Sequence, residues 1–600
     1  MRVRLEGQPA VVLAMLLERP NELVTRGELQ KKLWSGDTFV DFDQSLNAAI
    51  RRLRTVLDDS AESPRYVETL ARRGYRWIAP LHDEPLITAD EALPVPRSTN
   101  WRNAAWLVLA ACGATAAFYL AYSGLRSRPA SGKVLLVVLP FQNLSEDPQQ
   151  EYFADGMTEE MITQLGSLNP EQLGVIARTS ALQYKASHKN AGQIARELNV
   201  NYLLEGSVRR DEQRIRVTAQ LIQASDQAEI WADSYDSDIA DVLKVQSEAA
   251  RAIASQIRLQ LTKQTELRLS NAQRVNAVAH DAYLEGEHAW DVRDREGMAR
   301  SIEQFQRAIE IDPSYARAYA ALARAYALSP VYSVMPASEA MPKARDAATR
   351  AITLDASLAE GHCMMGFIKA HYEYDWAAAE QEFKIALKLN PSDPYAHLFY
   401  SNSYLSPRRR HDEAIAEMTR AIALDPFSPR IQSFLGRTYT WARRYDDALV
   451  QLQKTTEIFP SFAIVHERLA HLYTYRGEYD NAITEETRAR ILAHQDPRSV
   501  VKLEGSLRKA LATHGPRGYW EKMLELSRQS DNAPEAYTTN DNLAIIYARL
   551  GEKEKALQVL EQAYQERQLH MTEIAVEPAF DVLRSEPRFQ SLVRQIGVQQ

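Results

Sequence analysis

The C-terminal half of the chain repeats a pattern of prolines and small residues with a period near 34. A helix is expected to end at each of five positions: Asp312-Pro313, Asp355-Ala356, Asn390-Pro391, Asp425-Pro426 and Phe459-Pro460. The last three intervals between them are 35, 35 and 34 residues. A constant spacing of this size is typical of solenoids, in which each unit buries its apolar face against the next one. The pattern predicts an all-α array over residues 275–600 that ends in a capping helix.

Two kinds of residue recur inside these repeats. Small residues stand where two helices would cross, and tyrosines follow at matching places: Ala323, Gly366, Gly436, Ala470 and Ala544, then Tyr326, Tyr404, Tyr439, Tyr473 and Tyr547. The pattern resembles the tetratricopeptide repeat (TPR) family, with about seven units between residues 279 and 568. The resemblance implies a curved solenoid whose concave face binds a protein or peptide partner. We interpret the tyrosines as packing residues and not as a ligand-binding stripe.

A second constraint is the segment Ala104–Tyr122, which holds nineteen residues and no charge. Nineteen helical residues span roughly 28 Å, close to the ~30 Å hydrocarbon core of a bilayer. Tryptophans and tyrosines stand near both ends, where they suit the lipid–water interface. The segment predicts a single transmembrane helix, and a buried helix of a soluble domain is the alternative. The proline-punctuated residues 81–103 form the linker ahead of it.

Residues 1–80 contain three helical patterns. An apolar helix is predicted over Pro9–Glu18, and a second helix over Thr25–Trp34 opens with a capping-box sequence. A third helix is predicted over Asp43–Leu57 because apolar residues recur there at helical spacing, at Leu46, Ile50, Leu53 and Leu57. The three helices are short enough to share one small core.

The same region also contains a predicted β-hairpin and five arginines. Tyr66–Ala79 reads as two short strands with Gly74 at the turn. The arginines gather on the third helix and at the hairpin tip: Arg51, Arg52, Arg54, Arg72 and Arg73. Such a helix can enter the major groove of double-stranded DNA, where arginine reads guanine, while wing arginines reach phosphates. We therefore predict a DNA-binding winged helix-turn-helix, and a solvated basic surface is the alternative.

Three sequences here carry a family resemblance: LVTRGELQKKLW (Leu23–Trp34), LNAAIRRLRTVLDD (Leu46–Asp59) and YVETLARRGYRWIAP (Tyr66–Pro80). They resemble the OmpR/PhoB-type winged-helix effector domain over residues 5–80. The resemblance implies that Leu46–Leu57 is the recognition helix, with its three arginines on DNA and the two hairpin arginines in the wing. The family has a small N-terminal β-sheet, for which only Val3–Glu6 is present here. The order of winged helix, single span and outer domain resembles ToxR/CadC-like membrane regulators.

Residues 133–262 alternate strand and helix patterns and predict an α/β domain. Strands are expected over Val134–Phe141, Tyr202–Val208, Ile215–Ile222 and Ala228–Tyr235. Helices are expected over Thr158–Leu165, after an Asp155-Gly156 turn, and over Asp241–Leu261. The sequences LPFQNLS (Leu139–Ser145) and LLEGSVRR (Leu203–Arg210) resemble the domain similar to the N-terminal part of TolB, which often links an anchor or regulatory module to TPR repeats.

Enzyme chemistry has little support in the sequence. The acids that could serve catalysis are Asp155, Glu159, Glu160 and Glu205. We interpret Glu159 and Glu160, which follow Gly156, as helix-start residues and Glu205 as a strand-end residue. The two cysteines, Cys112 and Cys363, fall in different predicted environments and offer no metal-binding spacing. We therefore expect no catalytic residue, cofactor or metal, and an enzyme or nucleotide site in residues 133–262 is the alternative.

The sequence thus predicts a multidomain chain of winged helix-turn-helix (1–80), linker (81–103), transmembrane helix (104–122), α/β domain (133–262) and TPR solenoid (275–600). We expect a transcription regulator in the bacterial inner membrane that senses a protein or envelope signal. Since DNA binding needs a cytoplasmic N-terminus, the C-terminal domains are expected in the periplasm. A homodimer would place two winged helices on adjacent half-sites. The alternative is a membrane-anchored TPR scaffold for protein assembly with a non-functional winged helix.

Overall fold

The computed structural model describes residues 8–33, 50, 53–54, 57, 59, 64–70, 73–79, 133–145, 147, 150–169, 171–185, 187, 189–211, 214–270, 275–493, 495–528 and 540–598. The chain divides into two compact units, Met1–Ala121 and Tyr122–Gln600, which we call the N-terminal and C-terminal units. The expected transmembrane segment Ala104–Tyr122 and its linker lie outside the described residues. Among the residues that are described, every helix is too short or too polar to traverse a lipid bilayer.

The N-terminal unit, in its described part, combines helices with a small antiparallel sheet. Its elements are α1 (Gln8–Glu18), β1 (Val24–Thr25), α2 (Arg26–Leu33), β2 (Val67–Leu70) and β3 (Gly74–Trp77). Strand β3 lies between β1 and β2 and is antiparallel to both. Residues 50, 53, 54 and 57 are helical, in agreement with the predicted third helix, whose other residues are outside the described ones.

The predicted capping box at the start of α2 is confirmed. The backbone N–H and the hydroxyl of Thr25 donate to Glu28 Oε2 at 2.8 and 2.7 Å, and the Glu28 N–H donates to Thr25 Oγ1 at 3.3 Å. The hydrogen bonds that the Glu28 carboxylate accepts, first from the Thr25 backbone and then from the Thr25 hydroxyl and Arg19, lower the pKa of Glu28 to about 2. The box satisfies N–H groups that the first helical turn cannot bond internally.

The C-terminal unit begins with a mixed sheet. Its strands are β4 (Val134–Val138), β5 (Gln142–Asn143), β6 (Leu173–Ile176), β7 (Tyr202–Asp211), β8 (Arg214–Gln223) and β9 (Ala228–Asp238). They lie in the order β6-β4-β7-β8-β9, with β5 beside β7. Strand β4 is parallel to β6 and β7, whereas β7, β8 and β9 are antiparallel neighbours. The four longer predicted strands are present, although β4 ends at Val138 and not at Phe141.

Helices cover both faces of the inner part of this sheet. The helices are α5 (Glu151–Gly166), α6 (Arg178–Leu182), α7 (Ala191–Leu198), α8 (Val242–Gln256) and α9 (Lys263–Ser270). Alternate residues of β4 point to opposite faces. Leu136 and Val138 share a core with α5 and α8, while Val137 packs with residues of α6 and α7. The predicted α/β class follows from this layered arrangement.

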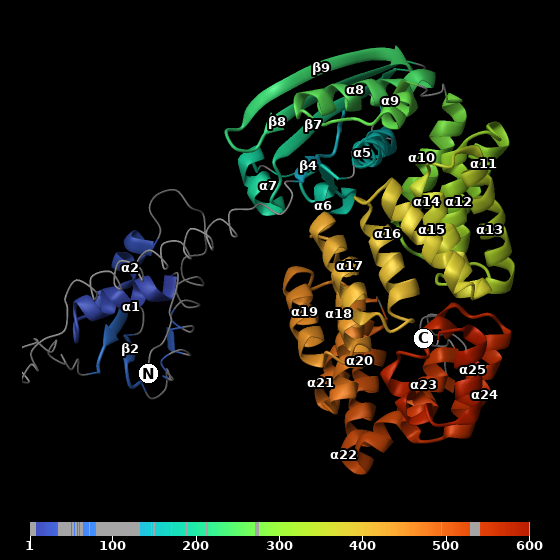
Figure 1. Ribbon diagram of the computed structural model, residues 1–600. Coiled ribbons are helices and arrows are strands. Elements are labelled where there is room, and N and C mark those ends of the chain that lie inside the picture. Colours follow the sequence, from blue (N-terminus) through green and yellow to red (C-terminus); the bar gives the residue numbers. More distant parts are fainter. Residues whose placement is uncertain are drawn as a thin grey trace, which may run out of the picture. The chain divides into compact units, whose positions relative to one another are not determined.

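Helix pairs fill most of the remaining chain (Figure 1). In the described residues they are α10 (Ala277–Asp291) with α11 (Arg295–Ile311), α12 (Ala316–Leu328) with α13 (Ala337–Leu354), α14 (Ala359–Ile368) with α15 (Trp376–Leu389), α16 (Pro394–Phe399) with α17 (His411–Leu424), α18 (Pro429–Trp441) with α19 (Tyr445–Ile458), α20 (Ala463–Arg476) with α21 (Tyr479–Leu492), and α23 (Asn540–Leu550) with α24 (Lys553–Gln565). The π-helical turns η3 (Lys369–Glu373) and η4 (Tyr400–Leu405) extend α14 and α16. Helix α22 (Pro497–Arg528), kinked at Gly515, follows α21.

The residues that marked the repeats in the sequence define their geometry. The second helices end at the predicted positions, with C-caps at Asp312, Asp355, Asn390, Asp425 and Phe459. A Cβ atom on Gly436 would lie 2.4 Å from the Leu452 side chain, so the glycine permits the close approach of α18 and α19. Small residues at the helix crossings therefore have a steric cause.

The predicted Asp155-Gly156 turn is wrong. Helix α5 begins at Glu151 and continues through both residues. A Cβ atom on Gly156 would lie 2.4 Å from Leu284 on α10, so this glycine permits close contact between the α/β domain and the first helix pair. Gly156, which the sequence suggests is a turn residue, is thus a helix residue that allows two helices to pack closely.

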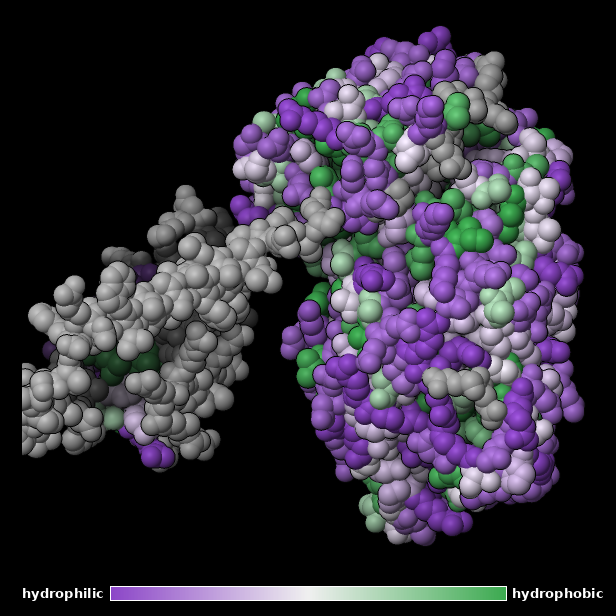
Figure 2. Space-filling view, in the orientation of Figure 1, coloured by the Kyte–Doolittle hydropathy of each residue, from purple (hydrophilic) through white to green (hydrophobic). Residues whose placement is uncertain are grey.

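The C-terminal end of the chain returns to the middle of the array. It consists of η6 (Leu569–Glu573), η7 (Pro578–Leu583) and α25 (Pro587–Ile596). The indole N–H of Trp376 on α15 donates to the Ile596 carbonyl at 2.6 Å, and Arg408 donates to the Gly597 carbonyl at 2.6 Å. Helix α25 packs beside α24, as a capping helix would, and in addition closes the array onto its third and fourth pairs. Figure 2 shows hydrophilic residues over most of the visible face of this unit, with apolar patches between them.

Candidate functional site

The described residues of the predicted recognition helix sit on the core of the N-terminal unit. Ile50 and Leu53 are 2% and 0% exposed and belong to one apolar cluster with Val12, Leu16 and Trp77. This cluster includes residues of α1, α2 and all three strands. The described part of the apolar stripe of the predicted helix therefore faces inward.

Arg54 connects the predicted recognition helix to the hairpin. Its Nη2 atom donates to the Val67 carbonyl at 2.7 Å and to Thr69 Oγ1 at 2.8 Å. The side chain is 11% exposed, and Nε lies 4.0 Å from the buried carboxylate of Asp59. The guanidinium thus has partners inside the domain, and we assign it a role in positioning the helix.

Asp59 continues the same connection. Its carboxylate accepts from the backbone N–H groups of Arg65 at 2.6 Å, Tyr66 at 3.4 Å and Val67 at 2.9 Å. Burial opposes ionisation of this group, but the three N–H donors and Arg54 outweigh it and lower the pKa of Asp59. Arg54 and Asp59 thus connect the helix to the hairpin through several hydrogen bonds.

The hairpin tip presents Arg73. Its backbone N–H donates to the Leu70 carbonyl at 2.9 Å, which closes the turn, while its side chain is exposed. A Cβ atom on the next residue, Gly74, would lie 2.1 Å from the Val24 carbonyl oxygen, so only glycine fits beside β1. Arg51, Arg52 and Arg72 lie outside the described residues. Of the five arginines predicted to contact DNA, the structure describes two: the Arg73 side chain is exposed, and the Arg54 side chain is mostly buried within the domain.

The C-terminal unit contains a cavity of about 520 Å³ that three parts of the chain surround. Helix α5 and the start of α6 form one wall, the first helices of six successive pairs form the second, and η6 completes the enclosure. The first helices are α10, α12, α14, α16, α18 and α20. The repeat face expected to receive a partner is therefore already in contact with two other segments of the same chain.

Carboxylates crowd one end of this cavity. Arg324 on α12 donates to both carboxylate oxygens of Glu287, at 2.6 and 2.7 Å, and lies 3.1 Å from Glu360. Glu159 on α5 lines the same end. Burial is the main reason that the pKa values of Glu159 and Glu360 rise to about 7. Their environment disfavours the accumulation of negative charge.

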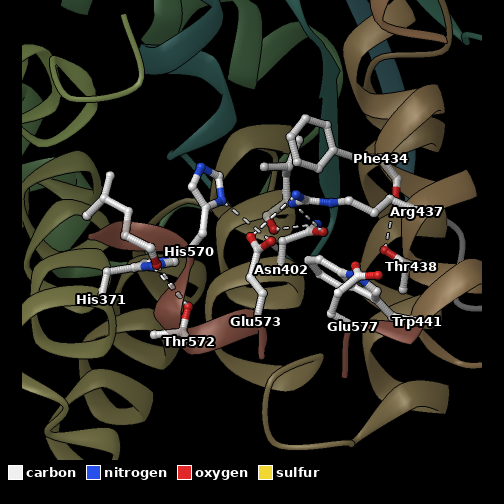
Figure 3. A network of polar contacts seen from close by, with 12 residues as sticks. His371, Asn402, Phe434, Arg437, Thr438, Trp441, His570, Thr572, Glu573 and Glu577 are labelled. Atoms are coloured by element: carbon white, nitrogen blue, oxygen red, sulfur yellow. Dashed lines mark hydrogen bonds and ion pairs between the residues drawn. The ribbon is translucent and has the colours of Figure 1, made fainter. Parts of the chain in front are cut away.

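Arginines gather at the other end, on α18 and α20. Arg437 lies 3.4 Å from Glu573 and donates to Asn402 Oδ1 at 3.3 Å (Figure 3). Its guanidinium also lies over the rings of Phe434 and Trp441, at 4.4 and 4.2 Å. Burial, reinforced by the like charge of Arg468, lowers the pKa of Arg437 to about 9.

Glu573 comes from η6 and enters the same network. Burial works against its charge, yet Arg437 and His570 hold the pKa of Glu573 at about 2. His371 is 6% exposed and its Nδ1 atom lies 2.9 Å from the Leu569 carbonyl, so η6 is fixed on both sides. This cluster could not be predicted from the sequence pattern, because η6 lies more than 100 residues from its partners Arg437 and His371.

The acids considered for catalysis have structural partners. Glu160 is 2% exposed and accepts from Arg317 at 2.8 Å and from Gln246. Asp155 accepts from Lys185 at 2.6 Å, and Glu205 accepts from Gln220 at 2.9 Å. The interpretation as helix-start residues is wrong for Glu159 and Glu160, which lie in the middle of α5. The interpretation of Glu205 as a strand-end residue is also wrong, because β7 continues from Tyr202 to Asp211.

Three family models match separate segments of the chain. Residues 2–77 match "Transcriptional regulatory protein, C terminal", residues 132–252 match "HilA/YgeH-like transcriptional regulator, second domain", and residues 374–429 match "Tetratricopeptide repeat". The chain therefore carries a winged-helix domain of the DNA-binding type, a HilA-like second domain and a TPR region. The HilA-like match covers residues 132–252, which is most of the region 133–262 that resembles the TolB-related domain.

Curated relatives match different lengths of the chain. The chain is 39% identical over 190 residues to the Rhizobium meliloti protein named "Putative adenylate cyclase 3", which covers 32% of each chain. It is 41% identical over 101 residues to the cholera toxin homolog transcriptional activator of Vibrio parahaemolyticus, covering 16% of this chain and 35% of that protein. It is 22% identical over 432 residues to the transcriptional regulator HilA of Salmonella typhimurium, covering 71% of this chain and 67% of that protein. The chain spans about one third of the length of the first two relatives.

Proposed function

We propose that the chain is a transcription regulator whose N-terminal unit binds promoter DNA. One observation carries this proposal: Arg54 and Asp59 join the recognition helix to the hairpin, as a helix and wing must be joined to bind one stretch of duplex together. The match of residues 2–77 to a regulatory-protein DNA-binding model supports it.

The contacts with DNA are assigned to four arginines. Arg51 and Arg52, on the predicted recognition helix, contact base edges in the major groove, where arginine pairs with guanine. Arg72 and Arg73, at the hairpin tip, contact phosphates or the minor groove. Arg54 supports this arrangement from inside the domain and is not among the proposed base contacts.

A salt-dependent gel shift with the full chain tests this function. Arg51→Ala and Arg52→Ala should each weaken specific binding by about 1–3 kcal/mol, while Arg73→Ala should weaken binding to all sequences and reduce the salt dependence. Arg19→Ala is the control, because Arg19 is an exposed arginine of the same unit that pairs with Glu28 on the α1–α2 side. Absence of DNA binding by the unmodified chain would leave the scaffold interpretation in its place.

The C-terminal unit is proposed to be the sensor. Its TPR region supports recognition of a protein or peptide, and the buried contacts between the α/β domain and the repeats allow a change in one to reach the other. We further propose that Ala104–Tyr122 anchors the chain in the bacterial inner membrane, with the sensor in the periplasm, and that dimerisation aligns two winged helices. A reporter fused after Gln600 should be active only outside the cytoplasm.

A further inference from the structure

The cavity of the C-terminal unit has the dimensions of a small-molecule site. Helix α5 and η6 line it together with the first helices of the repeats, and the space between them measures about 520 Å³. Sites for small molecules in proteins measure about 300–1,000 Å³. A ligand of that size would contact the α/β domain, the repeats and η6 at once.

The arginines on the α5 side of the cavity already have carboxylate partners. Arg317 donates to Glu160 at 2.8 Å. Arg324 donates to both oxygens of Glu287, at 2.6 and 2.7 Å, and lies 3.1 Å from Glu360. Neither arginine can therefore bind a ligand anion without giving up an existing ion pair.

The arginines on the α18 and α20 side are different. Arg430 and Arg468 line the cavity, and neither side chain has an ion pair or a hydrogen bond among the described residues. The Nε atoms of Arg468 and Arg437 are buried and lack a hydrogen-bond partner within the same part of the chain. Because buried polar groups normally have a partner, these donors point to a ligand.

Arg437 has only weak partners within the protein. It lies 3.4 Å from Glu573 and donates to Asn402 Oδ1 at 3.3 Å, both longer than a good charge-assisted hydrogen bond (Figure 3). The guanidinium groups of Arg437 and Arg468 both lie over the ring of Phe434, at 4.4 and 5.3 Å from its centroid. The two cations are thus close together, and the glutamate that reaches Arg437 compensates only part of their charge.

The charges on this side of the cavity decide the charge of the ligand. The lining residues of α18, α20 and η6 include three arginines and two glutamates: Arg430, Arg437, Arg468, Glu467 and Glu573. At a pH where the His570 ring is neutral, they leave one positive charge in excess. A ligand with a single negative charge balances that excess, whereas a doubly charged phosphate would exceed it. A carboxylate also matches the paired N–H donors of a guanidinium.

Apolar side chains adjoin these arginines. They come from α14, α16, α18, α20 and η6 and are Phe367, Leu398, Phe399, Phe434, Ile464 and Leu569. An apolar group transferred from water to such surroundings gains free energy. The ligand that fits is therefore an anion with an apolar body.

We propose that this cavity binds a small organic acid, with its carboxylate on Arg437 and Arg468 and its alkyl or aryl body among the apolar side chains. The site is additional to the protein or peptide recognition proposed for the repeats and does not depend on it. Because the lining comes from three parts of the chain, a bound acid would hold the α/β domain, the repeats and η6 together.

Ligand-observed NMR on the purified full chain tests the proposal. The probes are phenylbutyrate and octanoate, each compared with its neutral primary amide. We expect at least one acid to bind at about 1 mM or below, and its amide about tenfold or more weakly, because the amide keeps the apolar body and loses the charge. Acetate and inorganic phosphate, which lack that body, should not displace the acid at equal concentration. Absence of binding by both acids, equal binding of acid and amide, or displacement by phosphate overturns the proposal.

Arg468→Gln tests where the carboxylate lies. It should weaken binding of the acid about tenfold and leave that of the amide unchanged, so that the difference between them disappears. Equal weakening of acid and amide would overturn this placement, because a merely structural role of Arg468 affects both. The matched control is Arg444→Gln, whose side chain pairs with Asp447 outside the cavity lining. The comparison of acid and amide on the unmodified chain decides the matter even where a variant fails to fold.

The result is separable from that of the proposed function. The gel shift reads DNA binding by the N-terminal unit, and the NMR measurement is made without DNA. Capture of a protein by the repeats, together with no binding of either acid, would leave the sensor role standing and reject the acid site.

Discussion

Arg317 on α12 donates to the carboxylate of Glu160 on α5 at 2.8 Å, 157 residues away in the chain. Glu160 is 2% exposed, and Gln246 on α8 donates to its other oxygen. The pair lies where the α/β domain meets the repeats, as does the contact of Gly156 with Leu284. Domain and repeats thus share a buried polar contact as well as an apolar core.

Removal of one partner of this pair should destabilise the C-terminal unit strongly. Arg317→Ala leaves a buried carboxylate without its cation, and such changes cost about 3–5 kcal/mol. Urea unfolding of the full chain, followed by tryptophan fluorescence, measures the loss. Arg216→Ala, which breaks an exposed pair with Asp236 on the sheet, is the control and should change little. Equal losses of unfolding free energy in the two variants would show that the buried pair stabilises the protein no more than the exposed pair does.

Arg54 and Arg73 should separate stability from DNA binding. Arg54→Ala removes the hydrogen bonds to Val67 and Thr69 and should lower the unfolding free energy of the N-terminal unit by about 1–3 kcal/mol. Arg73→Ala changes an exposed side chain and should leave that free energy unchanged while weakening DNA binding. Thermal unfolding and gel shifts on both variants check this division. It fails if Arg54→Ala weakens DNA binding without any loss of stability.

Asp59 should make the N-terminal unit sensitive to acid. Its pKa is lower in the folded state than in the unfolded chain, so its stabilising effect is present above the unfolded value near about 4 and is lost as the pH falls through the folded value. Asp59→Asn should therefore be less stable than the unmodified chain at pH 7, and the difference should shrink below about pH 4. Denaturant titrations at pH 7 and pH 3 measure it. A constant difference would exclude ionisation as the cause.

Glu159 should give the C-terminal unit the opposite dependence. Its folded pKa of about 7 exceeds the unfolded value, so its favourable contribution is present below about pH 4.5 and is lost as the pH rises through 7. The unmodified chain should therefore be less stable at pH 8 than at pH 5.5. Glu159→Gln should reduce this fall, because the neutral amide does not titrate. Melting temperatures across this range provide the measurement, and identical pH profiles would contradict the assignment.

Two glycines should respond to alanine in opposite ways. Gly156→Ala places a methyl group 2.4 Å from Leu284, and overpacking of this kind costs about 1–3 kcal/mol. Gly505 lies in helix α22, where an added methyl group would have no atom within 4 Å, so Gly505→Ala should stabilise the helix by up to about 1 kcal/mol. Unfolding free energies of the two variants decide whether close packing or helix propensity controls each site.

Local signals in the sequence predicted local structure well. The capping box at Thr25, the hairpin around Gly74 and the helix ends at positions such as Asp425 depend on neighbouring residues, and the structure has them. The Asp155-Gly156 turn was predicted from the same kind of signal and is wrong, because Leu284, more than 100 residues away, determines what Gly156 does. Long-range packing is not visible in a short sequence window.

The cavity could have been predicted only in part. Phe399, Phe434 and Arg468 stand 35 and 34 residues apart, so they occupy the same place in successive repeats and line the cavity together. That spacing was available in the sequence and marks one face of the array. The contributions of Glu159 and Glu573 were not available, since they depend on how α5 and η6 fold back over the repeats.

The hydrogen bond from Trp376 to the Ile596 carbonyl can form only late in the synthesis of the chain. The two residues are 220 positions apart. At typical translation rates the ribosome needs about 10–40 seconds to make that stretch. Throughout this time the third and fourth repeats have no C-terminal segment to cover them. A chain that stops before α25 leaves the buried indole N–H of Trp376 without its acceptor, the Ile596 carbonyl.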